Sequence, residues 1–236
     1  MSASVRSGWA AGKAGVFFSA LAAAVFSALL LAGCGGSGDG KAVIYGTVTD
    51  SRDSQSYRTV KIGDLTWMAE NLNIEAEDSR CYNDDDSNCK KYGRLYNWNA
   101  AVKACPAEWR LPGAADWDNL IQAAGGGMRM EDKNSFGEIF YYWNIAKKLK
   151  SKTDWSENFA GTDDFGFSAI PGGSGLVGFM SGFYDAGGGG YWWSAAEDES
   201  GNARYMFMGS GDISGKISEN SSGKTEFLLS VRCVKE

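Results

Sequence analysis

The stretch NWNAAVKACPAEWRLPGAADWDNLIQAAGGG, residues 97–127, predicts the two helices that decide the fold of this chain. Asn97 is suited to cap the first helix, and Pro106 ends it because proline cannot continue a helix. Between these two residues the apolar side chains recur at helical spacing. They are Trp98, Ala101, Val102 and Cys105. Cys105 is therefore expected to face the interior of the domain.

The second helix is expected to follow the segment Trp-Arg-Leu-Pro at residues 109–112. Gly113 takes the cap position, Asp116 follows it three residues later, and the glycine run 125–127 ends the helix. Its apolar side chains recur with a period of 3.6 residues, which predicts one buried face. They are Trp117, Leu120, Ile121 and Ala124.

Short β-rich segments are expected at both ends of the domain. Residues 43–48 and 57–62 are predicted to form a hairpin across the polar turn 50–54, and residues 66–69 continue as a third extended piece. Residues 141–149 fit a third, shorter helix. The glycine-rich second half contains strand candidates at residues 165–169, 191–195, 204–208 and 227–234, with long loops at 172–190 and 209–223. The pattern predicts an α+β domain with early helices, long glycine-rich loops and terminal strands that pair.

The N-terminus has the features of a bacterial lipoprotein signal peptide. Arg6 and Lys13 precede the apolar run 14–31, which leads into Leu-Ala-Gly-Cys ending at Cys34. This tetrapeptide resembles the lipobox, whose cysteine accepts a diacylglycerol and becomes the first residue of the mature chain. An uncleaved membrane helix is the alternative, because the run approaches the length that spans a bilayer. Gly35 in place of aspartate implies an outer-membrane lipoprotein, on the cell surface or on the periplasmic face.

These features divide the chain into a signal peptide (1–33), a lipidated flexible linker (34–42) and a single domain (43–236). Loss of Arg6 and Lys13 with the signal peptide would take the formal net charge from −6 to −8. Nucleic acid and anionic lipid surfaces are bound through basic patches, so neither is expected as a partner. The membrane is expected as a partner through the lipid anchor.

Four cysteines remain for the domain once Cys34 carries lipid, namely Cys81, Cys89, Cys105 and Cys233. An even number in an exported chain predicts two disulfides, and four cysteines allow three pairings. The sequence alone does not choose among them, although proximity favours Cys81 with Cys89, which leaves Cys105 with Cys233. A zinc site is disfavoured because the chain has no CxxC motif and no histidine.

The absence of histidine from the whole sequence excludes several chemistries. Neither a Ser-His-Asp nor a Cys-His nucleophile can be formed, and there is no imidazole to bind a metal or act as a general base. Carboxylate, lysine and tyrosine chemistry remain.

Two groups of oxygen-bearing side chains are candidate calcium sites. The run Asp84, Asp85 and Asp86 lies between Cys81 and Cys89, with Asn83 and Asn88 beside it. However, successive side chains of an extended segment point in opposite directions, and the spacing Asp-x-Asp-x-Asp-Gly is absent. A solvated loop closed by a disulfide is therefore favoured there. The second group is the better candidate for a calcium ion, and no other cofactor is expected. A role of its aspartates in forming turns is nevertheless the simpler explanation for the group. Its members are Asp154, Asn158, Asp163 and Asp164.

Aromatic side chains beside the glycine loops are the candidate carbohydrate site, because sugars stack on aromatic faces through their C–H groups. The alternative is that these residues belong to the core. Since adjacent strand residues face opposite sides, at most one of two neighbouring tryptophans is expected in the main core unless a loop covers the other. The candidates are Phe183, Tyr184, Tyr191, Trp192 and Trp193.

Ordered sequence blocks over about residues 47–235 resemble the Fibrobacter succinogenes major paralogous domain family. The blocks are DSRD (50–53), VKIGDLTWMAENL (60–72), YGRLY (92–96), CP (105–106), WRLP (109–112), GTDDFGFSA (161–169), YWWS (191–194) and SVRCV (230–234). Members of that family are exported or surface proteins of polysaccharide-degrading anaerobes and their relatives, which implies a binding or adhesion role.

More remotely, the WRLP block before a helix and the terminal VRCV strand resemble the C-type-lectin-like fold shared with formylglycine-generating enzymes. That fold joins its first helix to its last strand by a disulfide, which implies Cys105 with Cys233. The chain departs from the functional motifs of these relatives. No proline stands in a Glu-Pro-Asn or Gln-Pro-Asp tripeptide, the cysteines are already used, and the histidines of sulfoxide synthases are absent.

The sequence therefore predicts a non-catalytic, lipid-anchored envelope or surface module that binds carbohydrate or another envelope protein through its glycine-aromatic loops. One alternative is a polysaccharide-acting enzyme with a carboxylate pair drawn from Asp154, Glu157, Asp163 and Asp164. A purely structural envelope lipoprotein is the other alternative.

Overall fold

The computed structural model describes residues 42–127, 129–134, 137–156, 158–210 and 217–236. The predictions for the signal peptide, for lipidation of Cys34 and for the linker up to residue 41 lie outside these residues. Gly40–Glu236 is one compact unit that contains two hydrophobic cores and two disulfides. We therefore expect this unit to fold without the residues that precede it. Within the described residues, no helix has the length and apolar character needed to cross a membrane.

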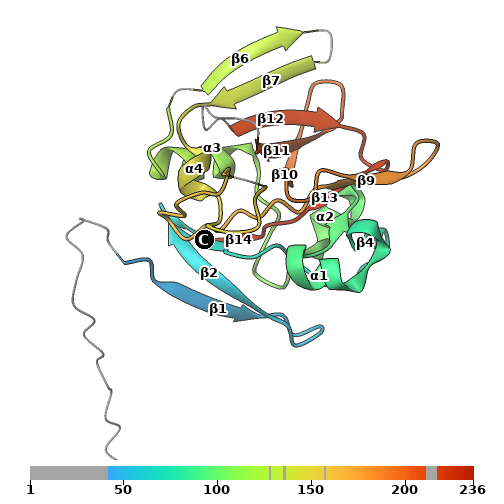
Figure 1. The fold of residues 1–236 in the computed structure, drawn as a ribbon, viewed down its shortest axis with the longest axis horizontal. Coiled ribbons are helices and arrows are strands. Elements are labelled where there is room, and N and C mark those ends of the chain that lie inside the picture. Colours follow the sequence, from blue (N-terminus) through green and yellow to red (C-terminus); the bar gives the residue numbers. More distant parts are fainter. Residues whose placement is uncertain (1–41, 128, 135–136, 157, 211–216) are drawn as a thin grey trace, which may run out of the picture. The chain divides into compact units, whose positions relative to one another are not determined.

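The first sheet joins the two ends of the domain. β1 and β2 form the predicted antiparallel hairpin, and the C-terminal β14 pairs with β3, so the terminal strands do meet (Figure 1). Asp50 fixes the hairpin turn, because its buried carboxylate accepts hydrogen bonds from Arg52 Nε at 2.9 Å and from the Arg52 backbone N–H at 3.0 Å. The strands in sheet order are β1 (Tyr45–Thr49), β2 (Ser56–Ile62), β3 (Leu65–Met68) and β14 (Val234–Lys235).

The second sheet is larger and is mainly antiparallel, with one parallel contact between β10 and β13. Its continuous path is β4 (Ser79–Arg80), β5 (Leu95–Tyr96), β13 (Phe227–Ser230), β10 (Gly189–Glu197), β11 (Ala203–Gly209), β12 (Ile217–Ser222), β7 (Gly137–Tyr142) and β6 (Arg129–Asn134). A short hairpin of β8 (Ser174–Leu176) and β9 (Gly182–Tyr184) is attached to β13 through β8.

The helices lie mostly in the first half of the described chain, as predicted. Asn97 caps α2 (Trp98–Ala104) by accepting a hydrogen bond from the backbone N–H of Ala100 at 2.8 Å. Asp116 accepts the N–H of Gly113 at 2.7 Å at the start of α3 (Ala114–Ala123). The remaining helices are the 3-10 turn η1 (Tyr82–Asp84), α1 (Asp86–Tyr92) and α4 (Ala146–Leu149).

Several predicted element boundaries are wrong. Val102 is exposed, because α2 buries only Ala101 and Ala104. The helix predicted at 141–149 is reduced to α4, since residues 137–142 pair as β7 with β6 and β12. The alternating segment 165–169 is irregular apart from one isolated bridge at its end. The supposed loops 172–190 and 209–223 contain β8, β9 and β12, and the last predicted strand is divided into β13 and β14.

Two hydrophobic cores pack against opposite faces of β10. Trp192 belongs to the first core, with Trp67, Trp117 and the inner face of α3. Trp193 belongs to the second core, with Tyr96 and residues of α2. The disulfide between Cys105 and Cys233 closes the second core, with Cα atoms 5.8 Å apart. Because both faces of the strand are covered, both tryptophans are fully buried.

The buried amide of Asn71 joins four parts of the fold. Its Nδ2 donates to the Tyr92 carbonyl at 2.9 Å and to Ser230 Oγ at 3.2 Å. Its Oδ1 accepts from Trp192 Nε1 at 2.9 Å and from Arg232 Nε at 2.8 Å. Every hydrogen-bonding group of this side chain is therefore used, as a buried amide requires.

Arg232 carries its charge in the interior, where it donates to backbone carbonyls. Its remaining nitrogens bond the carbonyl oxygens of Met68, Phe167 and Ser168. Burial lowers the pKa of this guanidinium to about 9, so the group stays cationic at neutral pH. The arginine and the amide together explain why the WMAENL and SVRCV blocks lie side by side.

Candidate functional site

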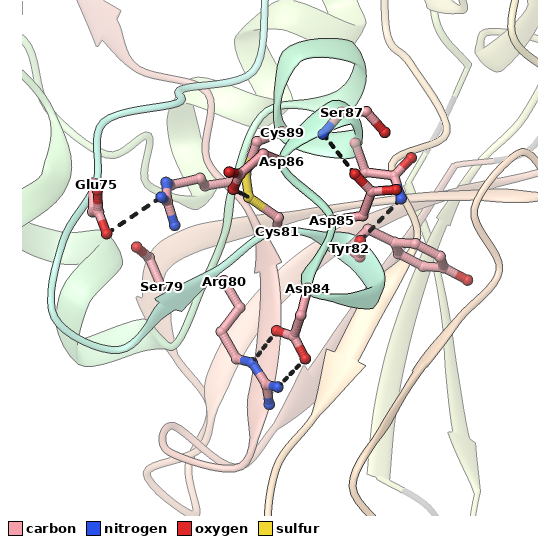
Figure 2. The surroundings of a disulfide bond; sticks show 12 residues. Glu75, Ser79, Arg80, Cys81, Tyr82, Asp84, Asp85, Asp86, Ser87 and Cys89 are labelled. Atoms are coloured by element: carbon pink, nitrogen blue, oxygen red, sulfur yellow. Dashed lines mark hydrogen bonds and ion pairs between the residues drawn. A yellow bond between two sulfur atoms is a disulfide. The ribbon is translucent and has the colours of Figure 1, made fainter.

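The segment between Cys81 and Cys89 is a helical element tied by a disulfide. The two cysteines are bonded to each other, which confirms the pairing favoured by proximity. Asp84 pairs with Arg80, and the carboxylate of Asp85 accepts the backbone N–H of Ser87 at 2.8 Å as the cap of α1 (Figure 2). The prediction of a solvated, disulfide-closed segment is confirmed, because the disulfide forms and the three aspartates are exposed. Its extended conformation is wrong, because Asp84 ends the 3-10 turn and Asp85 caps the helix that Asp86 begins.

The second acidic group does not form a metal centre in the described part of the chain. No set of three or more histidine, cysteine, aspartate or glutamate residues there is placed to hold a metal ion. Asp154 Oδ1 lies 3.4 Å from Lys91 Nζ, and Asp163 accepts the hydroxyl of Ser168 at 2.6 Å. Both carboxylates are thus engaged within the protein. Asn158 is exposed, the backbone N–H of Asp164 bonds the Lys148 carbonyl, and Glu157 lies outside the described residues.

Asp154 and Asp163 do line one common feature, a polar cleft of about 380 Å³. Its walls are the start of β2, the segment after β3, the end of α1 and the loops around residues 151–154 and 163–170. Arg58 Nε lies 3.2 Å from Glu70 Oε1, so this pair also balances its charges inside the cleft. Burial raises the pKa of Tyr57 to about 12, which makes its phenol a poor general base at neutral pH. The three carboxylates that line the cleft, those of Glu70, Asp154 and Asp163, are therefore all paired with groups of the protein.

The predicted carbohydrate site is changed by the burial of its tryptophans. Trp192 and Trp193 are not accessible to a ligand, and that part of the prediction is wrong. Tyr191 is half-buried, and Tyr184 is 50 % exposed. Phe183 is also half-buried and packs against Tyr82, with ring centroids 5.4 Å apart.

Tyr191 forms part of an aromatic row with two residues of the neighbouring strand β11, Tyr205 and Phe207. The centroid of the Tyr191 ring lies 4.7 Å from that of Phe207 and 6.2 Å from that of Tyr205. The row continues the face of Trp193, whose ring meets Tyr205 edge-on. Trp193 is covered by the second core, whereas the three residues of the row are half-buried.

Glycines leave the space into which these rings fold back. A Cβ atom on Gly189 would lie 2.7 Å from the Tyr191 ring and 3.2 Å from the Phe207 ring. A Cβ atom on Gly209 would lie 2.8 Å from the Phe207 ring. Each glycine is two residues from an aromatic residue of its own strand and so shares its face. The rings therefore lie over bare backbone, as aromatic side chains do where they cover glycines of a sheet.

Asp185 provides a polar group beside the row. Its carboxylate accepts a hydrogen bond from the Tyr191 hydroxyl at 2.7 Å. Burial, and then this carboxylate, raise the pKa of Tyr191, so the phenol stays protonated at neutral pH. The site thus combines aromatic faces with an exposed carboxylate.

Tyr205 and Phe207 were predicted as strand residues and missed as site residues. A usable signal was present in the sequence, because Gly189 precedes Tyr191 by two residues and Gly209 follows Phe207 by two. Which strand lies beside β10 was not readable from the sequence, and only that pairing brings the three rings together.

The family comparison agrees with the sequence blocks. A scan against protein-family models matches residues 60–235 to the Fibrobacter succinogenes major domain. A search of curated proteins and a search of solved structures found no match. The match covers more than half of the chain, and it includes all but the first of the blocks that carry the resemblance. The chain therefore belongs to the Fibrobacter succinogenes major domain family.

Proposed function

We propose that this protein is a non-catalytic, lipid-anchored module of the cell envelope or surface that binds carbohydrate on the aromatic row Tyr191, Tyr205 and Phe207. The observation that carries the proposal is the set of half-buried rings held over glycine backbone at the edge of a covered core. Rings in this position keep part of their area open to solvent, and their packing below fixes their orientation. Sugar C–H groups can stack on them without a large conformational cost.

The charge around the row favours a neutral glycan. Asp185 is exposed beside Tyr191, and the whole chain has a formal net charge of −6. A carboxylated or sulfated sugar would meet repulsion there, whereas a neutral sugar can donate its hydroxyl hydrogens to the carboxylate. Calcium is not needed for this mode of binding.

The placement in the envelope and the remote fold relationship belong to the same proposal. The signal-peptide pattern and Cys34 support an outer-membrane lipoprotein, since the acylated cysteine would begin the mature chain. The disulfide from the end of α2 to the start of β14, and the pairing of the terminal strands, support a C-type-lectin-like fold.

A carboxylate enzyme is the second candidate, because Asp154 and Asp163 line the same cleft. Their engagement with Lys91 and Ser168 weighs against a catalytic pair. The two functions are separable, since the cleft lining and the aromatic row share no residue.

The test is a glycan array and affinity electrophoresis with neutral and acidic polysaccharides, using Gly40–Glu236 with and without a chelator. Tyr191→Ala and Phe207→Ala should each weaken binding by roughly 2- to 10-fold, the effect of one aromatic contact. Tyr45→Ala is the matched control, because this exposed tyrosine lies on β1, in the other sheet.

The proposal fails if no glycan binds or if the row variants bind like the control. The enzyme candidate gains instead if the protein hydrolyses a polysaccharide and Asp154→Asn or Asp163→Asn abolishes the hydrolysis. Binding that the chelator removes would show that a cation is required.

A further inference from the structure

The apex of the β8–β9 hairpin carries large apolar side chains that contact solvent. Phe179 is fully exposed at 105 %, and Met180 is exposed at 66 %. Tyr184, on β9 below them, donates a hydrogen bond to the Met180 carbonyl at 3.3 Å. Figure 1 shows β9 and the turn before it projecting from the rest of the fold. The exposed apolar groups therefore sit on a convex tip.

The strands at the base of this hairpin are fixed by contacts with the rest of the domain, so the tip is held in an exposed position. β8 pairs with β13, and the backbone N–H of Val177 bonds the Glu226 carbonyl at 2.8 Å. Phe183 packs on Tyr82, and the Arg80 guanidinium lies 5.1 Å from its ring centroid. These contacts fix the two strands and leave residues 178–181 outside them.

No charged residue occurs between residues 172 and 184. The tip can leave water without removing an ionised group from its hydration shell, which is the main cost of entering an apolar phase. The nearest charges in the chain sequence are those of Asp164 and Asp185, outside the hairpin.

The size and shape of the tip decide between two kinds of partner. At about 200 Å² per large side chain, Phe179, Met180 and Tyr184 expose roughly 450 Å². A standard protein–protein interface needs about 800 Å² on each partner and a matching surface, which a convex tip of three side chains does not offer. A fluid bilayer adapts to a small convex apolar tip, and aromatic residues favour its interface.

We propose that the β8–β9 apex inserts Phe179 and Met180 into the surface of a phospholipid bilayer. The site is independent of the aromatic row and does not require that the row bind glycan. If Cys34 is acylated, the nine residues from it to Val43 reach at most about 30 Å, which keeps the domain close to the bilayer that holds the anchor. Apex insertion would then fix the orientation of the domain on the membrane.

The test is flotation of Gly40–Glu236, which lacks the acylated cysteine, with vesicles of pure phosphatidylcholine and with vesicles containing phosphatidylglycerol. Phe179→Ser combined with Met180→Ser should weaken partitioning onto phosphatidylcholine at least tenfold, because each buried side chain of this size is worth about that factor. The matched control is Ile44→Ser with Met130→Ser, which removes two residues exposed at 83 % and 53 % elsewhere on the surface.

The proposal stands if the wild type and the control float equally and the apex variant does not. It is overturned if the wild type floats with neither kind of vesicle, a result that would favour a protein partner for the apex. It is also overturned if the apex variant and the control variant bind the vesicles equally. The proposal is also overturned if the protein binds only vesicles that contain phosphatidylglycerol and salt releases it, because such binding is electrostatic adsorption. Tyr191→Ala should float like the wild type, which separates this result from any failure of glycan binding.

Discussion

Replacing Asn71 with alanine tests whether the buried amide holds the domain together. Asn71→Ala removes four hydrogen bonds at once. It leaves the Trp192 indole N–H and the Nε–H of Arg232 without their acceptor, and both side chains are fully buried. Neither donor can reach water without movement of the core.

The expected loss of stability follows from these two donors. An unsatisfied buried donor costs about 1–3 kcal/mol, and a donor on a charged group lies at the upper end of that range. The two unsatisfied donors, together with the two acceptors that lose the Asn71 amide, should lower the free energy of unfolding by about 4 kcal/mol. Because small domains are stable by about 5–15 kcal/mol, this is a large fraction of the total.

Urea unfolding of Gly40–Glu236, followed by tryptophan fluorescence, measures this difference at constant m value. Asn73→Ala is the matched control two residues away, since the buried Oδ1 of Asn73 has no hydrogen-bond partner. We expect the control to change stability by less than about 1 kcal/mol. If the two variants unfold within about 1 kcal/mol of each other, the amide is not the connection that we infer.

Three further predictions follow from other contacts. Cys105→Ser should lower the free energy of unfolding by about 5 kcal/mol and Cys81→Ser by about half as much, because their disulfides close segments of 128 and 8 residues. Calorimetry without reducing agent measures both losses, and equal losses in the two variants would contradict this dependence on loop length. The hydrogen bond from Arg52 lowers the pKa of Asp50, so its stabilisation is complete above about pH 4 and is lost as the pH falls through the lowered folded pKa. Asp50→Asn should therefore flatten the acid side of the stability profile, and an unchanged profile would contradict this assignment. Gly209→Ala should displace the Phe207 ring and weaken glycan binding, with little change in helix content by circular dichroism. Unchanged affinity would count against the proposed carbohydrate site.

The parts of the fold that were predictable are those determined by local sequence. The Asn97 cap, the Asp116 contact and the hairpin at Asp50 each depend on residues close together in the chain. The strands β12 and β8 were missed because serine, asparagine and glycine, which make up most of both, have little intrinsic strand preference. Pairing of β12 with β7 and of β8 with β13 stabilises them, and that pairing is not visible in a local pattern.

The candidate site was predictable as a region but not as a surface. The aromatic residues beside the glycine loops were selected as candidates, and of these Tyr184 is exposed and Tyr191 is half-buried. Tyr205, Phe179 and Met180 were not selected, because nothing in their own segments distinguishes an exposed apolar side chain from a buried one. Phe207 was not selected although Gly209 follows it by two residues.

The sequence by itself determined the family, the α+β composition, the number of cysteines and the absence of imidazole chemistry. Each of these is a property of residue identity and spacing along the chain. Only the tertiary structure decided that Trp192 and Trp193 are both buried and that the neighbouring row is not. The alternation of a strand assigns side chains to two faces, but what covers each face depends on elements far away in the chain.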